Sequence, residues 1–127
     1  MKQVHEVLID ALKDLRANGW IKGDLGSING PKCASGALRV AVCGQMSIPG
    51  ITVEEQLFQA SRTALLRAAV EDSLSEGTED IRGVYNVPTW NDKDGRTFEE
   101  VESAFERAIL NTLPIELSFE EALKETI

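Results

Sequence analysis

Three short patterns of the form Ser/Thr-x-x-Glu constrain what this chain can fold into. They are Thr52 with Glu55, Thr97 with Glu100, and Ser118 with Glu121. Each stands directly before a stretch with apolar residues at helical spacing. In such a capping box the hydroxyl and the carboxylate bond the free backbone N–H groups of the first turn. The sequence therefore predicts helices that begin near residues 52, 97 and 118.

Two further helices are expected before residue 45. Over residues 3–17 apolar side chains recur at helical spacing, and Asn18-Gly19 is a typical C-terminal stop. Residues 33–44 are small and apolar with one charge, Arg39, which indicates a buried helix at the centre of the fold. Gly36 in this helix would let a neighbouring segment approach closely.

The helix that starts at Thr52 is expected to reach about Leu74. Leu65 and Val70 widen its predicted inward face, which consists of Val53, Leu57, Ala60, Ala64 and Ala68. Residues 81–88 have β-branched and aromatic character but contain Gly83 and Pro88. They predict at most a short edge strand of a two-stranded β-ribbon.

These elements predict a mainly α fold, with four to five helices in a single compact domain over residues 1–127. The helical core spans about residues 3–112, and residues 115–127 form an amphipathic tail. A chain of 127 residues buries roughly two-thirds of its unfolded surface, so folding requires neither a metal nor a disulfide. No metal site and no cofactor are expected.

The charge is acidic overall but uneven along the chain. Thirteen basic and 21 acidic residues give a net charge of -8. Residues 1–51 carry six basic and four acidic residues, whereas residues 52–95 and 96–127 each have a net charge of -5. This balance disfavours nonspecific binding to nucleic acids or to anionic membranes. A locally positive site within the first 51 residues remains compatible with it.

The chain opens MKQVHEV without an apolar leader, and its two cysteines lie ten residues apart. Secretion and a disulfide framework are therefore not expected. No apolar run approaches the roughly 20 residues that span a bilayer. We expect a cytoplasmic protein that does not enter a membrane.

Candidate catalytic groups are few. His5 is the single histidine, so one chain cannot build a Ser-His-Asp triad or a two-histidine metal site. We expect His5 at the solvated start of the first helix. Cys33 lies near a predicted helix N-terminus, which would favour a thiolate, but a small buried residue is the preferred interpretation. Neither a nucleotide-binding P-loop nor an EF-hand fits the glycine-rich segments.

A candidate ligand site combines the glycine-rich loop 20–32 with the polar turn 90–97. Its tryptophans would stack on a base, and its basic groups would hold an anion. The candidate residues are Trp20, Lys22, Lys32, Trp90, Asn91, Asp92 and Arg96. The preferred alternative is structural: Trp90 packs in the core, Asn91 and Asp92 bond their own turn, Gly95 takes a positive φ, and Thr97 caps the next helix.

Three ordered segments carry a resemblance to a known family. They are Gly19-Trp20-x-Lys22-Gly23, Cys33-Ala34-x-Gly36-Ala37-Leu38, and Val87-Pro88-x-Trp90-Asn91-Asp92-x-x-Gly95-Arg96-Thr97-x-x-Glu100-Val101. Together they resemble a small helical family from actinobacteria and their phages that is catalogued only as a domain of unknown function. The resemblance spans about residues 8–110. It implies no activity, cofactor or catalytic residue, and it places the protein in a phage or bacterial setting.

Three functions are compatible with these observations. The first is a non-enzymatic accessory binding protein, a phage-encoded modulator of a host or defence protein that acts in the host cytoplasm. The second is a binder of a nucleotide-like anion, and the third is an enzyme using Cys33 as nucleophile or Asp92 as base. We expect a protein partner or self-association. The tail, with Leu117, Phe119, Leu123 and Ile127, either docks on that partner or folds back on its own core.

Overall fold

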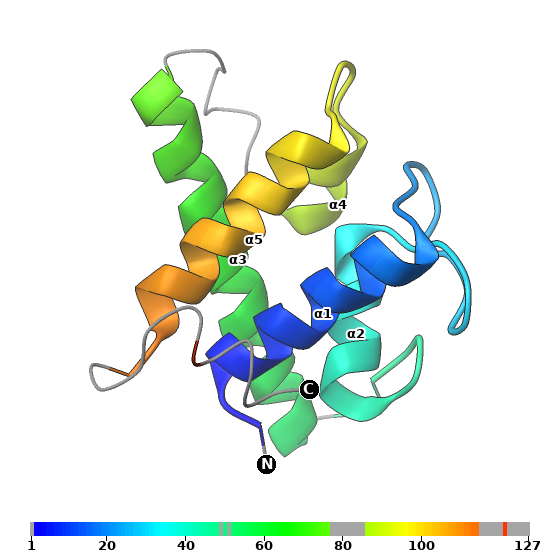
Figure 1. The fold of residues 1–127 in the computed structure, drawn as a ribbon. Coiled ribbons are helices and arrows are strands. Elements are labelled where there is room, and N and C mark those ends of the chain that lie inside the picture. Colours follow the sequence, from blue (N-terminus) through cyan, green and yellow to red (C-terminus); the bar gives the residue numbers. More distant parts are fainter. Residues whose placement is uncertain (1, 49, 51, 77–85, 115–120, 122–127) are drawn as a thin grey trace.

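The computed structural model describes residues 2–48, 50, 52–76, 86–114 and 121. Within these ranges five α-helices follow one another: α1 (Val4–Asn18), α2 (Ala34–Cys43), α3 (Val53–Glu76), α4 (Val87–Asp92) and α5 (Phe98–Thr112). Figure 1 shows α5 lying across the long helix α3, with α1 beside α5 and α2 against α1. The prediction of a mainly α fold with four to five helices is confirmed.

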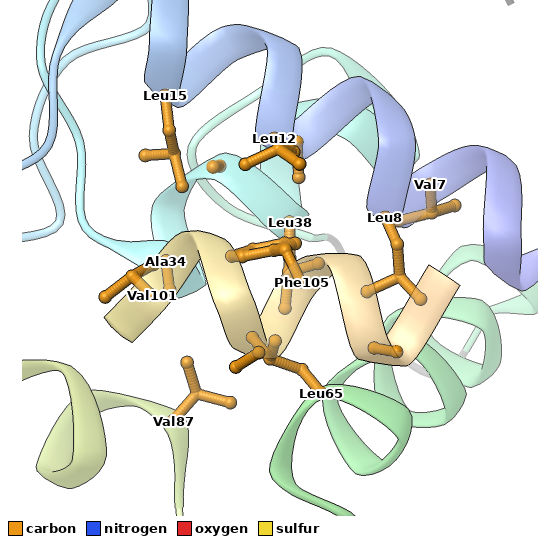
Figure 2. Close-up of a cluster of buried hydrophobic side chains, with 14 of the residues drawn as sticks. Val7, Leu8, Leu12, Leu15, Ala34, Leu38, Leu65, Val87, Val101 and Phe105 are labelled. Atoms are coloured by element: carbon orange, nitrogen blue, oxygen red, sulfur yellow. The ribbon is translucent and has the colours of Figure 1, made fainter. Parts of the chain in front are cut away.

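One hydrophobic core joins the helices. Figure 2 shows Leu12, Leu38, Leu65 and Phe105, which come from α1, α2, α3 and α5, in a single cluster of side chains. Each of the four is at most 1% exposed. Val87 adds a contribution from α4 and is fully buried. Truncating one of these leucines to alanine typically costs about 2–5 kcal/mol, because a cavity remains.

His5 belongs to the buried side of α1, and its predicted surface position is wrong. The residue is only 5% exposed. It lies three residues before Leu8 and seven before Leu12, so all three share the face that packs on the core. The Nδ1 atom of His5 is buried and has no hydrogen-bond partner in the described structure. The first turn of α1 is therefore not solvated, because α1 packs along its length on neighbouring helices.

The inward face of α3 also differs from the prediction. Phe58, Leu65 and Ala68 are at most 4% exposed and face the core. Val53 is 55% exposed, and Ala60 is exposed as well. The predicted face is therefore right at Leu65 and Ala68, and wrong at Val53 and Ala60. Packing against α5 and α2 decides which side is buried.

Helix α4 occupies part of the segment expected to be an edge strand. The Oδ1 atom of Asn86 accepts a hydrogen bond from the N–H of Thr89 at 2.7 Å, and Pro88 lies in the first turn. Both features are typical of helix starts. Residues 81–85 of the predicted strand lie outside the described residues. In the described part the β structure is limited to isolated bridges between Trp20 and Lys32 and between Gly26 and Lys32.

The capping box at Thr97 is confirmed in full, and at Thr52 the bond to the hydroxyl is present. The N–H of Glu55 donates to Thr52 Oγ1 at 3.1 Å, and that of Glu100 donates to Thr97 Oγ1 at 3.3 Å. The predicted box at Ser118 and the tail of residues 115–127 lie outside the described residues, apart from the helical residue Glu121.

Helix α2 is buried as predicted only through its first half. The residues from Ala34 to Leu38 are buried, whereas Arg39, Val40 and Cys43 are partly exposed. None of the helices in the described ranges combines the length and the hydrophobicity that crossing a bilayer requires.

Candidate functional site

The glycine-rich loop between α1 and α2 is closed by backbone hydrogen bonds at its base. The N–H of Lys32 donates to the carbonyl of Gly19, and the N–H of Ile21 donates to the carbonyl of Lys32, both at 3.1 Å. Gly26 packs directly on the returning strand of the loop, with φ of +99°. A Cβ atom at this position would lie 2.1 Å from the carbonyl oxygen of Pro31. The loop therefore has one compact path that only glycine permits at position 26.

The same loop packs on the beginning of α2. The N–H of Cys33 donates to the carbonyl of Leu25 at 3.1 Å. A Cβ atom on Gly36 would lie 2.4 Å from the carbonyl oxygen of Leu25. The close approach predicted at Gly36 is confirmed, and its neighbour is the glycine-rich loop.

Asn91, in the last turn of α4, joins this loop to the rest of the fold. Its side chain is fully buried. Its Oδ1 atom accepts hydrogen bonds from Trp20 Nε1 at 2.6 Å and from the N–H of Ala34 at 3.0 Å. Its Nδ2 donates to the carbonyl of Ile21 at 3.1 Å and to Asp92 Oδ1 at 2.9 Å. One amide thus connects the loop, the start of α2 and α4.

Neighbouring groups extend these contacts into what we call the Asn91 cluster. Its members are Trp20, Ile21, Lys22, Gly23, Ala34, Asn91, Asp92 and Lys93. The N–H of Gly23 donates to Asp92 Oδ1, and Lys22 Nζ donates to the carbonyl of Lys93, both at 2.9 Å. The Lys22 ammonium also lies 5.8 Å from the centroid of the Trp20 ring. The polar atoms of the cluster bond each other.

Lys32 and Arg96 were predicted to supply positive charge to a ligand, and the structure gives each an internal partner. Lys32 is fully buried, and its Nζ contacts Asp14 Oδ1 at 3.0 Å and the carbonyl of Gly30 at 2.7 Å. Arg96 is 6% exposed and donates through Nε to the carbonyl of Trp90 at 2.9 Å. Its guanidinium also lies 3.3 Å from Glu100 Oε2.

The two tryptophans among the candidates differ in burial. Trp90 is 2% exposed and lies in the core, with the Arg96 guanidinium carbon 5.1 Å from its ring centroid. Trp20 is partly exposed and stacks on Phe98 with ring centroids 6.1 Å apart. The structure therefore brings Trp20, Lys22, Asn91 and Asp92 together. A ligand-binding role for these residues stays a prediction.

Within their own turn Asn91 and Asp92 bond each other, with Asn91 Nδ2 donating to Asp92 Oδ1 at 2.9 Å, but their other bonds leave the turn. Both accept from, or donate to, groups of the glycine-rich loop, about 70 positions away in the sequence. Gly95 does take the predicted positive φ, at +81°. The turn is thus shaped by its glycine, and the polar side chains before it serve contacts across the fold.

Cys33 is buried at the N-cap of α2. Its Sγ accepts a weak hydrogen bond from the N–H of Gly36 at 3.4 Å, an interaction that favours a thiolate. Burial acts in the opposite direction and is the larger effect, so it raises the pKa of the Cys33 thiol above its ordinary value. The negative charge of Asp92 raises the pKa further. Cys33 consequently has little thiolate at neutral pH.

An open hollow that the sequence interpretation missed lies along α3 beside the end of α5. This α3–α5 groove has a volume of about 640 Å³, and its lining residues are Thr63, Ala64, Leu66, Arg67, Val70, Glu71, Asn111 and Thr112. Leu74, one turn beyond Val70, is 64% exposed. The spacing of Leu66, Val70 and Leu74 at every fourth position was a signal in the sequence for this second apolar side of α3.

No group of three or more His, Cys, Asp or Glu side chains in the described ranges is arranged to hold a metal ion.

The fold and the candidate site together define a small all-α domain in which a glycine-rich loop is fastened to a short fourth helix by one buried asparagine. The chain belongs to the DUF6197 family, a family of unknown function whose model matches residues 1–111. The expected membership in a family without an assigned function is confirmed. No curated protein and no solved structure matches the chain. The match ends at the last residues of α5, next to the α3–α5 groove.

Proposed function

We propose that this protein is a non-enzymatic binding module that docks an acidic amphipathic helix of a partner protein in the α3–α5 groove. The observation that carries the proposal is the second apolar side of α3. A surface helix in a small domain normally has one apolar stripe, and a second stripe is typical of a helix with a further packing partner.

The shape of the groove suits a helix. From Thr63 to Glu71 its lining follows about 12 Å of α3, or roughly two turns at 1.5 Å per residue. Leu66 and Val70 are half-buried in it, and the exposed Leu74 continues it by another turn. Helices that bind grooves insert side chains at positions i, i+3 or i+4, and i+7, a spacing that matches this length.

The charged side chains of the groove indicate which kind of partner helix would bind there. Arg67 is exposed at the groove and has no acidic partner among the described residues. The carboxylate of Glu71 is already bonded by Asn111 Nδ2 at 2.7 Å. Arg67 is therefore the group of the groove that can pair with a carboxylate presented by a partner helix beside its apolar side chains.

The two other candidate functions receive less support. An enzyme with Cys33 as nucleophile needs a thiolate, whereas burial favours the neutral thiol. An exposed Asp92 that accepts from Gly23 and Asn91 is unsuited to act as a base. A nucleotide-like anion at the Asn91 cluster would have to displace hydrogen bonds that already hold the loop in place. We therefore favour protein binding.

Such a module would act in the cytoplasm. The proposal includes the setting that the sequence suggested, in which the protein is a phage-encoded accessory factor that modulates a host or defence protein. A small acidic domain with an open groove could act in this way by covering a helix through which the target protein otherwise binds its own partner.

Site-specific photo-crosslinking tests this function. A photoreactive residue replaces Thr63 inside the groove, and a matched control replaces Val53, which is also on α3 but outside the groove. We expect the Thr63 probe, in the full chain within its native host, to attach to an acidic amphipathic helix of another protein. Leu74→Glu should abolish the adduct, and the Val53 probe should give none.

Two outcomes contradict the proposal. Attachment of the Thr63 probe to residues 115–127 of the same chain would mean that the tail fills the groove. Attachment to a second copy at the mass of a dimer would mean that the groove mediates self-association. Peptide mapping of the adduct distinguishes both from a foreign partner.

A further inference from the structure

The tail of residues 115–127 has a sequence with the properties that the proposed function requires of a partner helix. Phe119, Leu123 and Ile127 recur at every fourth position, a spacing that puts them on one side of a helix. Ser118 with Glu121 is a capping box that marks its start, and Glu121 is helical in the structure. The tail also carries four acidic residues and one basic residue, which are Glu116, Glu120, Glu121, Glu125 and Lys124. By its sequence it is an acidic amphipathic helix.

The apolar side of the tail matches the groove in length. Leu66, Val70 and Leu74 also recur at every fourth position, and Leu66 to Leu74 covers about 12 Å of α3 at 1.5 Å per residue. Phe119 to Ile127 covers the same number of residues. Leu66 and Val70 are half-buried and Leu74 is 64% exposed, so the side chains of a second helix can still cover them. A tail helix laid along α3 would place its apolar side chains against those of the groove over about two turns.

The tail is joined to the chain directly beside the groove. Thr112, the last residue of α5, lines the groove. Leu113 has extended backbone angles, with φ of -63° and ψ of 141°, so the chain leaves the helix at this point. The stretch from Thr112 to Ser118 spans up to about 20 Å when it is extended at about 3.3 Å per residue. This reach exceeds the length of the groove, so the tail helix can lie in it while α5 stays in place.

The charges of the tail and the groove are complementary. Residues 115–127 carry a net charge of -3, from their four acidic residues and Lys124. Arg67 is exposed in the groove and forms no ion pair with a described carboxylate. The Glu71 carboxylate, which would repel the tail, is already bonded by Asn111 Nδ2 at 2.7 Å. Arg67 therefore favours an acidic helix in this groove, and the tail supplies one.

We propose that the tail docks in the α3–α5 groove while no partner is bound, and that a partner helix has to displace it. The inference rests on the proposed function, because it concerns the regulation of the same site. A short linker gives the tail an effective concentration of about 1 mM at the groove, whereas a helix of about ten residues is only marginally stable by itself. Docking is therefore reversible, and the groove described above is its open state. The tail excludes weak ligands, and a partner that binds more tightly replaces it.

Photo-crosslinking of the purified full chain, without any partner, tests this inference. The photoreactive residue again replaces Thr63, and Val53 is again the control position. We expect an adduct within one chain, at the mass of the monomer, that peptide mapping places in residues 115–127. Leu123→Glu should reduce this adduct about tenfold or more, because it puts a charge into the apolar side of the tail. Lys124→Glu introduces the same side chain at the neighbouring position, outside the apolar side, and should keep the adduct.

The same probes in the native host separate the two proposals. There the partner displaces the tail, and Leu123→Glu should raise the yield of the partner adduct about twofold or more, because the competing tail is lost. A purified chain without a tail adduct, or with an equal adduct for Leu123→Glu, overturns the inference and leaves the proposed function in place. An adduct only at the mass of a dimer overturns the inference as well. A tail adduct that persists in the host without a foreign partner contradicts the proposed function instead.

Discussion

The Asn91 cluster and the α3–α5 groove differ in how many of their side chains already have contacts within the fold. The cluster contains the residues that most resemble a functional site, yet its amide, indole and carboxylate groups bond each other. The groove lies on a helix with no distinctive motif. Leu66 and Val70 are only partly buried in it, Arg67 is exposed, and Leu74 beyond it is 64% exposed. Distinctive residues here stabilise the fold, and the ordinary helix offers the open surface.

This difference has a general physical basis. A loop of irregular backbone leaves many N–H and carbonyl groups without helical partners, so it needs polar side chains to satisfy them. Tryptophan, asparagine and aspartate in such a loop therefore often serve the backbone. A long helix satisfies its own backbone, which leaves its outer side chains free for contacts with other molecules.

The largest expected loss of stability comes from a substitution that distorts the backbone of the glycine-rich loop. Gly26→Ala places a Cβ atom 2.1 Å from the Pro31 carbonyl oxygen at a φ of +99°, and should lower the free energy of unfolding by roughly 4 kcal/mol. Urea denaturation measures it. Gly23→Ala is the matched control, because its φ is +80° and nothing lies within 4 Å of the added Cβ. That variant should cost only about 1 kcal/mol.

The next largest effect removes the amide at the centre of the cluster. Asn91→Ala leaves the N–H of Ala34 and the carbonyl of Ile21 without their partner, and should lower the free energy of unfolding by about 3 kcal/mol. Asp94→Ala, in the exposed turn nearby, should change it by less than about 0.5 kcal/mol. Similar costs for the two variants would show that the cluster is not the structural element described above.

A smaller effect depends on pH. Burial raises the pKa of Cys33 in the folded protein, whereas the unfolded thiol titrates near 9.0. Above that pH the unfolded chain loses the proton first, so stability falls as pH rises, by up to about 1.4 kcal/mol per pH unit. Cys33→Ser keeps a hydrogen-bond acceptor for Gly36 without titrating in this range.

The two proteins should therefore differ in how stability changes between pH 8 and pH 10, by about 1 kcal/mol. Denaturation curves at both pH values measure the difference, and parallel behaviour of the variant and the wild type would contradict a raised pKa. Iodoacetamide should also label the partly exposed Cys43 before Cys33.

The smallest effect on stability is expected for a substitution at the α3–α5 groove. Leu74 is 64% exposed, so Leu74→Glu should change the free energy of unfolding by less than about 0.5 kcal/mol. The same substitution should abolish crosslinking from Thr63. A loss of stability above 1 kcal/mol would show that Leu74 already packs within the chain, and the contrast between cluster and groove would then fail.

Local signals in the sequence predicted most of the fold. The capping boxes at Thr52 and Thr97 and the stop at Asn18-Gly19 depend on neighbouring residues, and helices end or begin there as expected. Helix α4 was missed because six residues carry too little periodicity, and packing on α2 and α3 stabilises it. The burial of His5 and Phe58 and the exposure of Val53 were missed because tertiary packing decides which residues of a helix are covered.

The sequence predicted which residues belong to the candidate site, but it did not predict the hydrogen bonds between them. The residues at positions 20, 22, 91 and 92 were recognised as belonging together because tryptophan, charged and amide side chains occur in a glycine-rich loop and a polar turn. Their pairing was not, since hydrogen bonds between residues about 70 positions apart leave no periodic trace. The groove had a trace in Leu66, Val70 and Leu74, but only Val70 of the three was assigned to a face, and it was placed on the inward one.

The long reach of the Asn91 contacts has a consequence for the order of folding. Its side chain bonds Ala34, Ile21 and Trp20, which are 57, 70 and 71 positions away. Such contacts are formed only after distant parts of the chain have been brought together, and the loop-closure entropy makes them slow to reach. The helices should associate first and the glycine-rich loop should be fastened last. The contacts of Asn91 then mainly slow unfolding, because contacts that form after the folding transition state must break before the chain can unfold.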